Sequence, residues 1–192
     1  MSQEMRARAM IGSRQLLVER EAPARDRALA HLAEHCADRA FRIARDLLGE
    51  PAAAEDAVQE AMAVAIGGVA RLRDPAALEG WFYRVLSNHC MRVLRRQRWL
   101  AVWTRRRAAD AEMEAASGPV PDAALAEARQ RARLLLAVGD LPAMQKAAVV
   151  LRYGHDHSVE EVGALLGVSP KTIKTHLVRG LRALRAALGE ER

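Results

Sequence analysis

The chain has 192 residues and a formal net charge of +6 at pH 7, with a sequence pI near 10.1. This length accommodates one domain or two small ones, and the basic balance favours a polyanionic partner. The sequence contains no run of eighteen apolar residues and no apolar signal-peptide core, so we expect no membrane span, no cleaved leader and a cytoplasmic location.

Helical periodicity dominates the chain, because strand-like alternation is almost absent and β-branched residues are sparse. We therefore predict an all-α fold. In chain order, the expected helices cover about Arg25–Leu48, Ala53–Leu72, Ala77–Val102, Ala123–Val138 and Asp140–Gly154, followed by a helix-turn-helix over 158–185. Residues 107–122 are rich in Ala, Ser, Gly, Pro and acidic residues, which is typical of a linker. Two small helical domains joined by a flexible tether are the predicted architecture.

The first expected helix contains His31, His35 and Cys36 at spacings that could share one helix face. A closed zinc site needs four well-placed ligands, and neither Cys36 nor the distant Cys90 has metal-site spacing. We therefore interpret both cysteines as small core residues and predict no metal and no cofactor.

The third expected helix is distinguished by its charge. From Gly80 to Ala109 there is no Asp or Glu, and the eight arginines of this stretch are Arg84, Arg92, Arg95, Arg96, Arg98, Arg105, Arg106 and Arg107. It also holds five of the chain's seven aromatic residues: Trp81, Phe82, Tyr83, Trp99 and Trp103. Arginines bind phosphates and aromatic faces stack on unpaired bases, so the stretch favours nucleic-acid contact. The alternative, that the first three aromatics fill a core, stays open.

Residues 158–185 carry the strongest local pattern. Ser158 and Glu161 have the spacing of a capping box, and Gly167 is placed to end this first short helix in the left-handed conformation. Ser169 can cap a second helix, with Pro170 in its first turn. These signals predict a helix-turn-helix that binds duplex DNA; a plain amphipathic hairpin with a solvated charged face is the weaker alternative.

The second helix of this motif separates an apolar stripe from a cationic tip. The stripe consists of Ile173, Leu177, Leu181, Leu184 and Leu188. The polar residues predicted to reach a major groove are Ser169, Lys171, Thr172, Lys174, Thr175, His176 and Arg179. In the turn before the motif, His155 and His157 are expected to be solvated.

Three segments, 39–62, 80–98 and 141–188, together resemble bacterial RNA polymerase sigma factors, in the short form typical of the extracytoplasmic-function group. The resemblance covers roughly 25–100, the family's region 2, and 136–188, its region 4. It implies an N-terminal extension over 1–24, region 2 over 25–103, an acidic linker over 104–122 and region 4 over 123–192.

The resemblance implies a non-enzymatic subunit that binds RNA polymerase core, directs it to promoter DNA and helps to open the duplex. Asp56, Gln59 and Glu60 match the family's Asp-x-x-Gln-Glu signature, which contacts the clamp helices of the large polymerase subunit; the flap is a further expected contact. On the residues alone, these side chains share one helix face that suits a basic partner or, equally, solvent. An anti-sigma factor is implied as an additional partner.

The loop Leu72–Pro75 matches the family loop that captures a flipped −10 base, and the helix after it matches the one that holds the opened strand. The residues implied for the −10 element and melting are Arg73, Asp74, Trp81, Tyr83, Arg84, Asn88, Arg92, Arg95 and Arg96. The resemblance also implies that the polar face of the helix-turn-helix binds the −35 element. The acidic linker is implied to enter the polymerase's RNA path, and a merely solubilising tether would have the same sequence.

Three departures from the family pattern lead to further expectations. Met62 and Ile66, followed by two glycines, replace the usual Phe and Trp, so looser packing is expected there. Arg92 replaces a usual aspartate and adds positive charge. His176 stands where arginine is common and cannot contact guanine in the same bidentate way, so we expect a different −35 preference.

Two other functions fit parts of the sequence less well. The recognition-helix sequence also resembles output domains of two-component regulators, but residues 1–135 show no alternating strand and helix pattern of a receiver domain. An enzyme acting on nucleic acid would need a phosphate-binding glycine loop or a catalytic constellation, and none occurs in the sequence.

Overall fold

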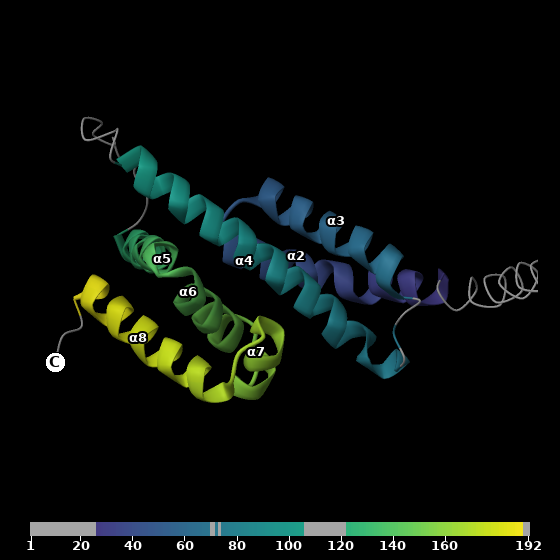
Figure 1. Cartoon of the computed structure of the whole chain (residues 1–192). Helices are drawn as coiled ribbons and strands as arrows, with labels where there is room; N and C mark the ends of the chain where they lie inside the picture. Colours follow the sequence, from purple (N-terminus) through teal and green to yellow (C-terminus); the bar gives the residue numbers. More distant parts are fainter. Residues whose placement is uncertain (1–25, 70–71, 73, 106–121, 190–192) are drawn as a thin grey trace, which may run out of the picture.

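The computed structural model describes residues 26–69, 72, 74–105 and 122–189, and within these ranges all regular elements are helical, as predicted (Figure 1). The first half contains a helical stretch 26–31, the π-helix η1 (Leu32–Cys36), α2 (Ala37–Leu48), α3 (Pro51–Gly68), the 3-10 helix η3 (Pro75–Ala77) and α4 (Leu78–Arg105). The second half contains α5 (Asp122–Asp140), α6 (Ala143–Val149), the π-helix η4 (Val150–Gly154), α7 (Val159–Leu166) and α8 (Pro170–Leu188). No helix in the described part of the chain is long and apolar enough to cross a bilayer.

The element boundaries differ from the predictions in instructive places. The first helix is not continuous α-helix, because η1 is inserted into it, and η4 likewise ends the helix that begins at Ala143. α3 stops at Gly68 rather than Leu72, since two consecutive glycines weaken a helix end. α4 extends to Arg105, past the expected end at Val102. The predicted tether lies mostly outside the described residues, which resume at 122.

Helices α2, α3 and α4 pack against one another to form the first helical body. The fully buried residues of α3 are all alanines, namely Ala54, Ala57, Ala61 and Ala65, whereas Val58 and Met62 pack against the core while only partly buried. Small residues on one stripe allow neighbouring helix axes to approach closely. The larger core side chains come from the partners, above all Leu32, Ile43, Leu47, Phe82 and Leu86.

The helix-turn-helix prediction is confirmed by its caps. The Ser158 Oγ accepts a hydrogen bond from the Glu161 N–H at 3.2 Å, and the Ser158 N–H donates to the Glu161 carboxylate at 2.7 Å. Gly167 adopts φ +68°, the left-handed conformation expected of it. The Ser169 Oγ then accepts from the Thr172 N–H at 3.2 Å and starts α8. Local hydrogen bonds thus cap both helices of the motif.

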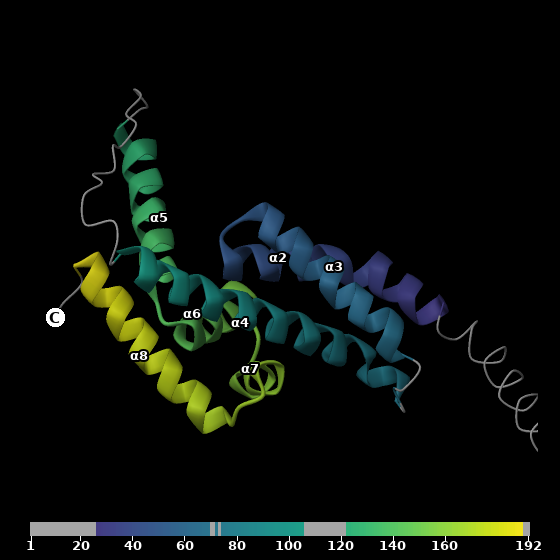
Figure 2. The same ribbon diagram turned by 45° about the horizontal axis from the view of Figure 1, so that its top comes forward.

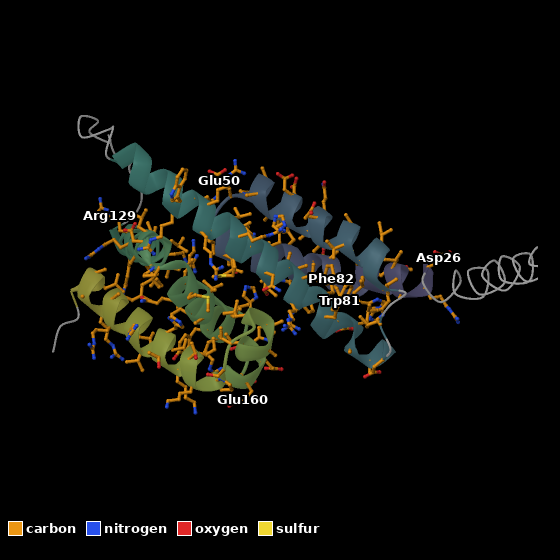
Figure 3. The ribbon with its side chains drawn as sticks, in the orientation of Figure 1. Asp26, Glu50, Trp81, Phe82, Arg129 and Glu160 are labelled. Atoms are coloured by element: carbon orange, nitrogen blue, oxygen red, sulfur yellow. The ribbon has the colours of Figure 1, made fainter. Side chains whose placement is uncertain are left out.

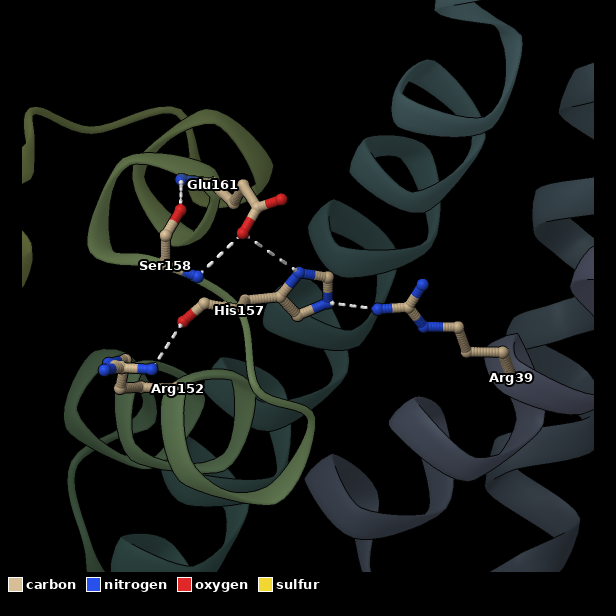
Figure 4. Close-up of polar contacts among 5 residues, drawn as sticks. All are labelled: Arg39, Arg152, His157, Ser158 and Glu161. Atoms are coloured by element: carbon tan, nitrogen blue, oxygen red, sulfur yellow. Dashed lines mark hydrogen bonds and ion pairs between the residues drawn. The ribbon is translucent and has the colours of Figure 1, made fainter.

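The second helical body is formed by α5, α6, η4, α7 and α8. It lies on the side of α4 opposite to α2 and α3 (Figures 1 and 2). α6 and α7 contact α4, while η4 contacts α2. The turn after η4 takes part in this contact: His155 Nε2 lies 3.0 Å from Asp46 Oδ2, and the Arg39 guanidinium donates to His157 Nε2 at 3.4 Å (Figure 4). The expectation that both histidines are solvated is therefore wrong, because their side chains are only 9% and 10% exposed.

Burial at this contact lowers the pKa of both histidines, His155 and His157, since the charged imidazolium loses solvation. The Asp46 carboxylate opposes the effect at His155, while the Arg39 charge reinforces it at His157. Figure 4 also shows how the turn is held, with the Arg152 guanidinium donating to the His157 carbonyl at 3.3 Å. The part of the contact made by the turn after η4 is therefore polar and titratable.

Candidate nucleic-acid and partner interfaces

The predicted polymerase-binding residues Asp56, Gln59 and Glu60 line one depression between α3 and α4. All three side chains are exposed. The remaining lining residues are Ala53, Ala63, His89 and Val93. We call this depression the acidic groove; it presents two carboxylates and an amide on one side and α4 on the other.

The α4 side of the acidic groove was missed by sequence reasoning. The Arg92 guanidinium donates a hydrogen bond to His89 Nδ1 at 3.0 Å. Burial, followed by the charge of Arg92, lowers the pKa of His89, although Glu60 and Asp56 act in the opposite direction. The groove therefore combines carboxylates with an imidazole that Arg92 holds from outside the lining. Only the packing of α3 on α4 brings His89 to this place, so periodicity alone carried no signal for it.

The aromatic residues at the start of α4 divide between core and surface (Figure 3). Phe82 is fully buried and Tyr83 is 6% exposed, so the core interpretation holds for these two. Trp81 is half-buried, and a Cβ added at Gly68 would lie 2.8 Å from its ring. The indole thus closes the helix end that was expected to be loose, while Ile66 is left 49% exposed. Trp99 is exposed, and the Trp103 side chain lies outside the described residues.

The polar residues predicted for strand holding form one continuous stripe on α4. Arg84, Asn88, Arg92 and Arg96 are each four residues apart, and Arg95 lies three residues after Arg92, which places the five on one side of the helix. All five are exposed. We call this face the arginine stripe. It offers positive charge along several turns of helix without an intervening carboxylate, which suits a phosphate backbone.

The loop before α4 is described only in part. Asp74 is exposed, and its Oδ1 accepts a hydrogen bond from the Ala76 N–H at 3.0 Å, which starts η3. Asp74 therefore has a structural role besides any contact with a base. Arg73 lies outside the described residues.

The predicted DNA-reading face of α8 is exposed and cationic. Lys171, Lys174, Thr175 and Arg179 border one shallow depression, together with Val178 and Arg182. The unpaired N–H groups at the start of a helix add partial positive charge near this face.

Three residues predicted for this face are less available than the others. Ser169 and Thr172 are engaged in the cap, with their hydroxyl oxygens 2.8 Å apart. His176 is half-buried, and its Nδ1 is buried with no hydrogen-bond partner among the described residues. Thr175 is exposed, but its hydroxyl donates to the Lys171 carbonyl oxygen at 3.1 Å. The exposed charged side chains of this face are thus the two lysines and Arg179.

Comparison with known proteins matches both halves of the chain. The family model of sigma-70 region 2 matches residues 32–100, and that of sigma-70 region 4 matches residues 131–184. The RNA polymerase sigma-E factor of Streptomyces coelicolor is 31% identical over 79% of this chain and 80% of its own length. The ECF RNA polymerase sigma factor SigE of Mycolicibacterium smegmatis is 32% identical over 80% of this chain, which spans 59% of that relative.

A solved structure shares the fold. The sigma factor RpoE of Bartonella quintana, crystallised with the anti-sigma factor NepR, aligns with a TM-score of 0.56 and 22% identity, covering 81% of this chain and 93% of that one. The chain therefore belongs to the sigma-70 family of RNA polymerase sigma factors, in its extracytoplasmic-function group.

Proposed function

We propose that this sigma factor binds RNA polymerase core through the acidic groove, holds the opened −10 strand on the arginine stripe and reads the −35 element with α8. The observation that carries the proposal is the separation of these surfaces: the groove and stripe lie on the first helical body, and the cationic face of α8 lies on the second. The groove carries carboxylates for a basic protein surface, and the arginine stripe and the α8 face carry positive charge for DNA phosphates. In this role the protein supplies specificity and no catalysis of its own, and it works in the cytoplasm with the polymerase.

The domain assignment follows from the same division. We assign region 2 to 25–103, an acidic linker to 104–122 and region 4 to 123–192, with an extension over 1–24. The sixteen residues 106–121 can span at most roughly 55 Å when extended. Such a tether would let the two bodies separate and reach two promoter elements at once.

Separation would first break the contact of α7 with α4 and of η4 with α2. We propose that an anti-sigma factor binds this protein and blocks its surfaces for polymerase and promoter DNA. The proposal is supported by the similarity in fold to a sigma factor that was crystallised with an anti-sigma factor.

The polymerase contact can be tested without DNA. The double variant Asp56→Ala, Gln59→Ala should bind core polymerase at least about tenfold more weakly, since two groups of one interface are lost. Glu55→Ala is the matched control, because Glu55 is an exposed carboxylate on the same helix that does not line the groove. Binding measured by fluorescence anisotropy should be unchanged in the control. Equal affinities for the double variant and the wild type would disprove this assignment.

A further inference from the structure

A cluster of potential metal ligands lies away from the three surfaces described above. His31, Cys36 and Glu79 each offer one ligand atom, and these atoms all lie within 4.8 Å of one another. The His31 Nε2 and the Glu79 Oε1 are 2.8 Å apart, although the two residues are separated by 48 positions in the sequence. We propose that these three residues form a binding site for a single zinc-class divalent cation.

The π-helix η1 is what brings two of the ligands together. In an α-helix at 3.6 residues per turn, side chains five residues apart point roughly 140° away from each other. In a π-helix the backbone pairs residues five apart, so His31 and Cys36 come to lie on the same side. π-turns of this kind are frequently found at functional sites. The sequence pattern assumed α-helical geometry and grouped His35 with these residues instead.

The donor set suits zinc. A cysteine sulfur, a histidine nitrogen and a carboxylate oxygen are the ligand types that zinc takes, and three protein ligands leave a fourth position for water or a partner's side chain. An ion can enter from the solvent side, where the His31 and Glu79 side chains are 43% and 52% exposed. The Cys36 thiol is 1% exposed and faces the site from the core.

Binding would release the thiol proton of Cys36 to solvent, and the thiolate would then neutralise part of the cation's charge. Burial raises the pKa of Cys36, so without an ion the thiol stays protonated. A hydrogen bond from Tyr83 to the sulfur favours the thiolate, and Arg39 acts in the same direction. Tyr83 and Arg39 would thus stabilise the Cys36 thiolate, as residues around the ligands of zinc sites commonly do.

The remaining surroundings orient His31. The His35 ring stacks on the His31 ring with centroids 4.7 Å apart, and His35 Nδ1 lies 3.2 Å from the His31 carbonyl oxygen. The Nε2 of His31 is thereby directed at Glu79. A bound ion would fasten the segment that precedes α2 to the first turn of α4, beside Trp81. The inference rests on these contacts and does not depend on the proposed function.

The test uses the full-length, tag-free chain, reduced and treated with chelator. Titration with Co²⁺ should produce a thiolate-to-cobalt charge-transfer band that saturates at one ion per chain, and Zn²⁺ should abolish it by displacement. Cys36→Ala should remove the band. Cys90→Ala is the matched control, because Cys90 is equally buried but lies outside the cluster, and it should leave the band intact.

A second variant keeps the proposal falsifiable if Cys36→Ala disturbs the fold. Glu79→Gln retains shape on an exposed residue, and it should weaken Zn²⁺ binding at least about tenfold in competition with a chromophoric chelator. Absence of the band in the wild-type chain, its loss in Cys90→Ala, or unchanged Zn²⁺ affinity in Glu79→Gln would each overturn the site.

Discussion

The two helices proposed to contact DNA are built on different plans. In α8 the buried residues and the cationic residues occupy separate faces, so the core could be repacked without touching a lysine. In α4 the adjacent residues Trp81, Phe82 and Tyr83 pass from a half-buried indole to two core rings within one turn. α4 belongs to the first helical body and also contacts α6 and α7 of the second. Stability and nucleic-acid contact are therefore separable in α8 and closely linked in α4.

The largest expected effect tests the structural role of α4. Phe82→Ala should lower the free energy of unfolding by about 3–5 kcal/mol, because a fully buried ring is replaced by a cavity. Arg84→Ala, on the arginine stripe, should change it by less than about 0.5 kcal/mol. Urea unfolding followed by circular dichroism measures both. Similar stabilities for the two variants would contradict the division between core and surface.

The next effect tests whether α8 separates its two roles. Lys174→Ala combined with Arg179→Ala should weaken binding to −35 DNA by about 2 kcal/mol, roughly thirtyfold, and reduce the salt dependence by about two phosphate contacts. Arg185→Ala, exposed in the last turn of the same helix, serves as the control. Stability should be unaffected in every variant. Equal weakening by the control would mean that only overall charge matters.

A smaller effect distinguishes capping from DNA contact at Ser169. Ser169→Ala should cost about 1 kcal/mol of stability through the lost cap, whereas Ser169→Gly should cost only a few tenths. If capping is the role, Ser169→Gly also keeps most of the −35 affinity. Equally poor binding by the two variants, measured by anisotropy, would instead indicate a direct contact of the hydroxyl with DNA.

The smallest effect concerns the contact between the two bodies. The pKa values of His155 and His157 are lowered in the packed form, so the separated form takes up protons first as the pH falls below the ordinary value of 6.5. Packing should be fully present above that pH and weaken progressively below it. Small-angle scattering from about pH 7.5 to pH 5.5 should show an increasing radius of gyration.

The double variant His155→Gln, His157→Gln should show a flatter pH profile. The two imidazoles that face Asp46, Arg39 and Glu161 are then replaced by side chains that do not titrate. An unchanged slope would assign the opening to other groups.

The sequence predicted what local hydrogen bonds and helical periodicity determine. The caps at Ser158, Gly167 and Ser169 involve residues at most four apart, so each could be found from spacing alone. The excess of arginine in α4 could likewise be found from one segment of the sequence, although its arrangement as one stripe was described only from the structure. The all-α fold and the order of helices were likewise accessible.

Features that depend on packing between distant segments were not predictable. His89 joins the acidic groove only because α3 packs on α4, and Tyr83 is buried because α2 covers it. The burial of His155 and His157 depends on contact between the two bodies. The π-helix at Leu32–Cys36 departs from the 3.6-residue period on which the helix prediction relied, and it regroups His31 and Cys36 with Glu79.

We propose that α4 and α8 both contact promoter DNA during initiation by RNA polymerase. Run-off transcription with core polymerase and promoter fragments from the source genome tests it most directly. We predict a transcript that depends on the added protein, is lost with Asp56→Ala plus Gln59→Ala, and at promoters that require the −35 element is lost with Lys174→Ala plus Arg179→Ala. Failure of the wild-type protein to produce any promoter-dependent transcript would contradict the account.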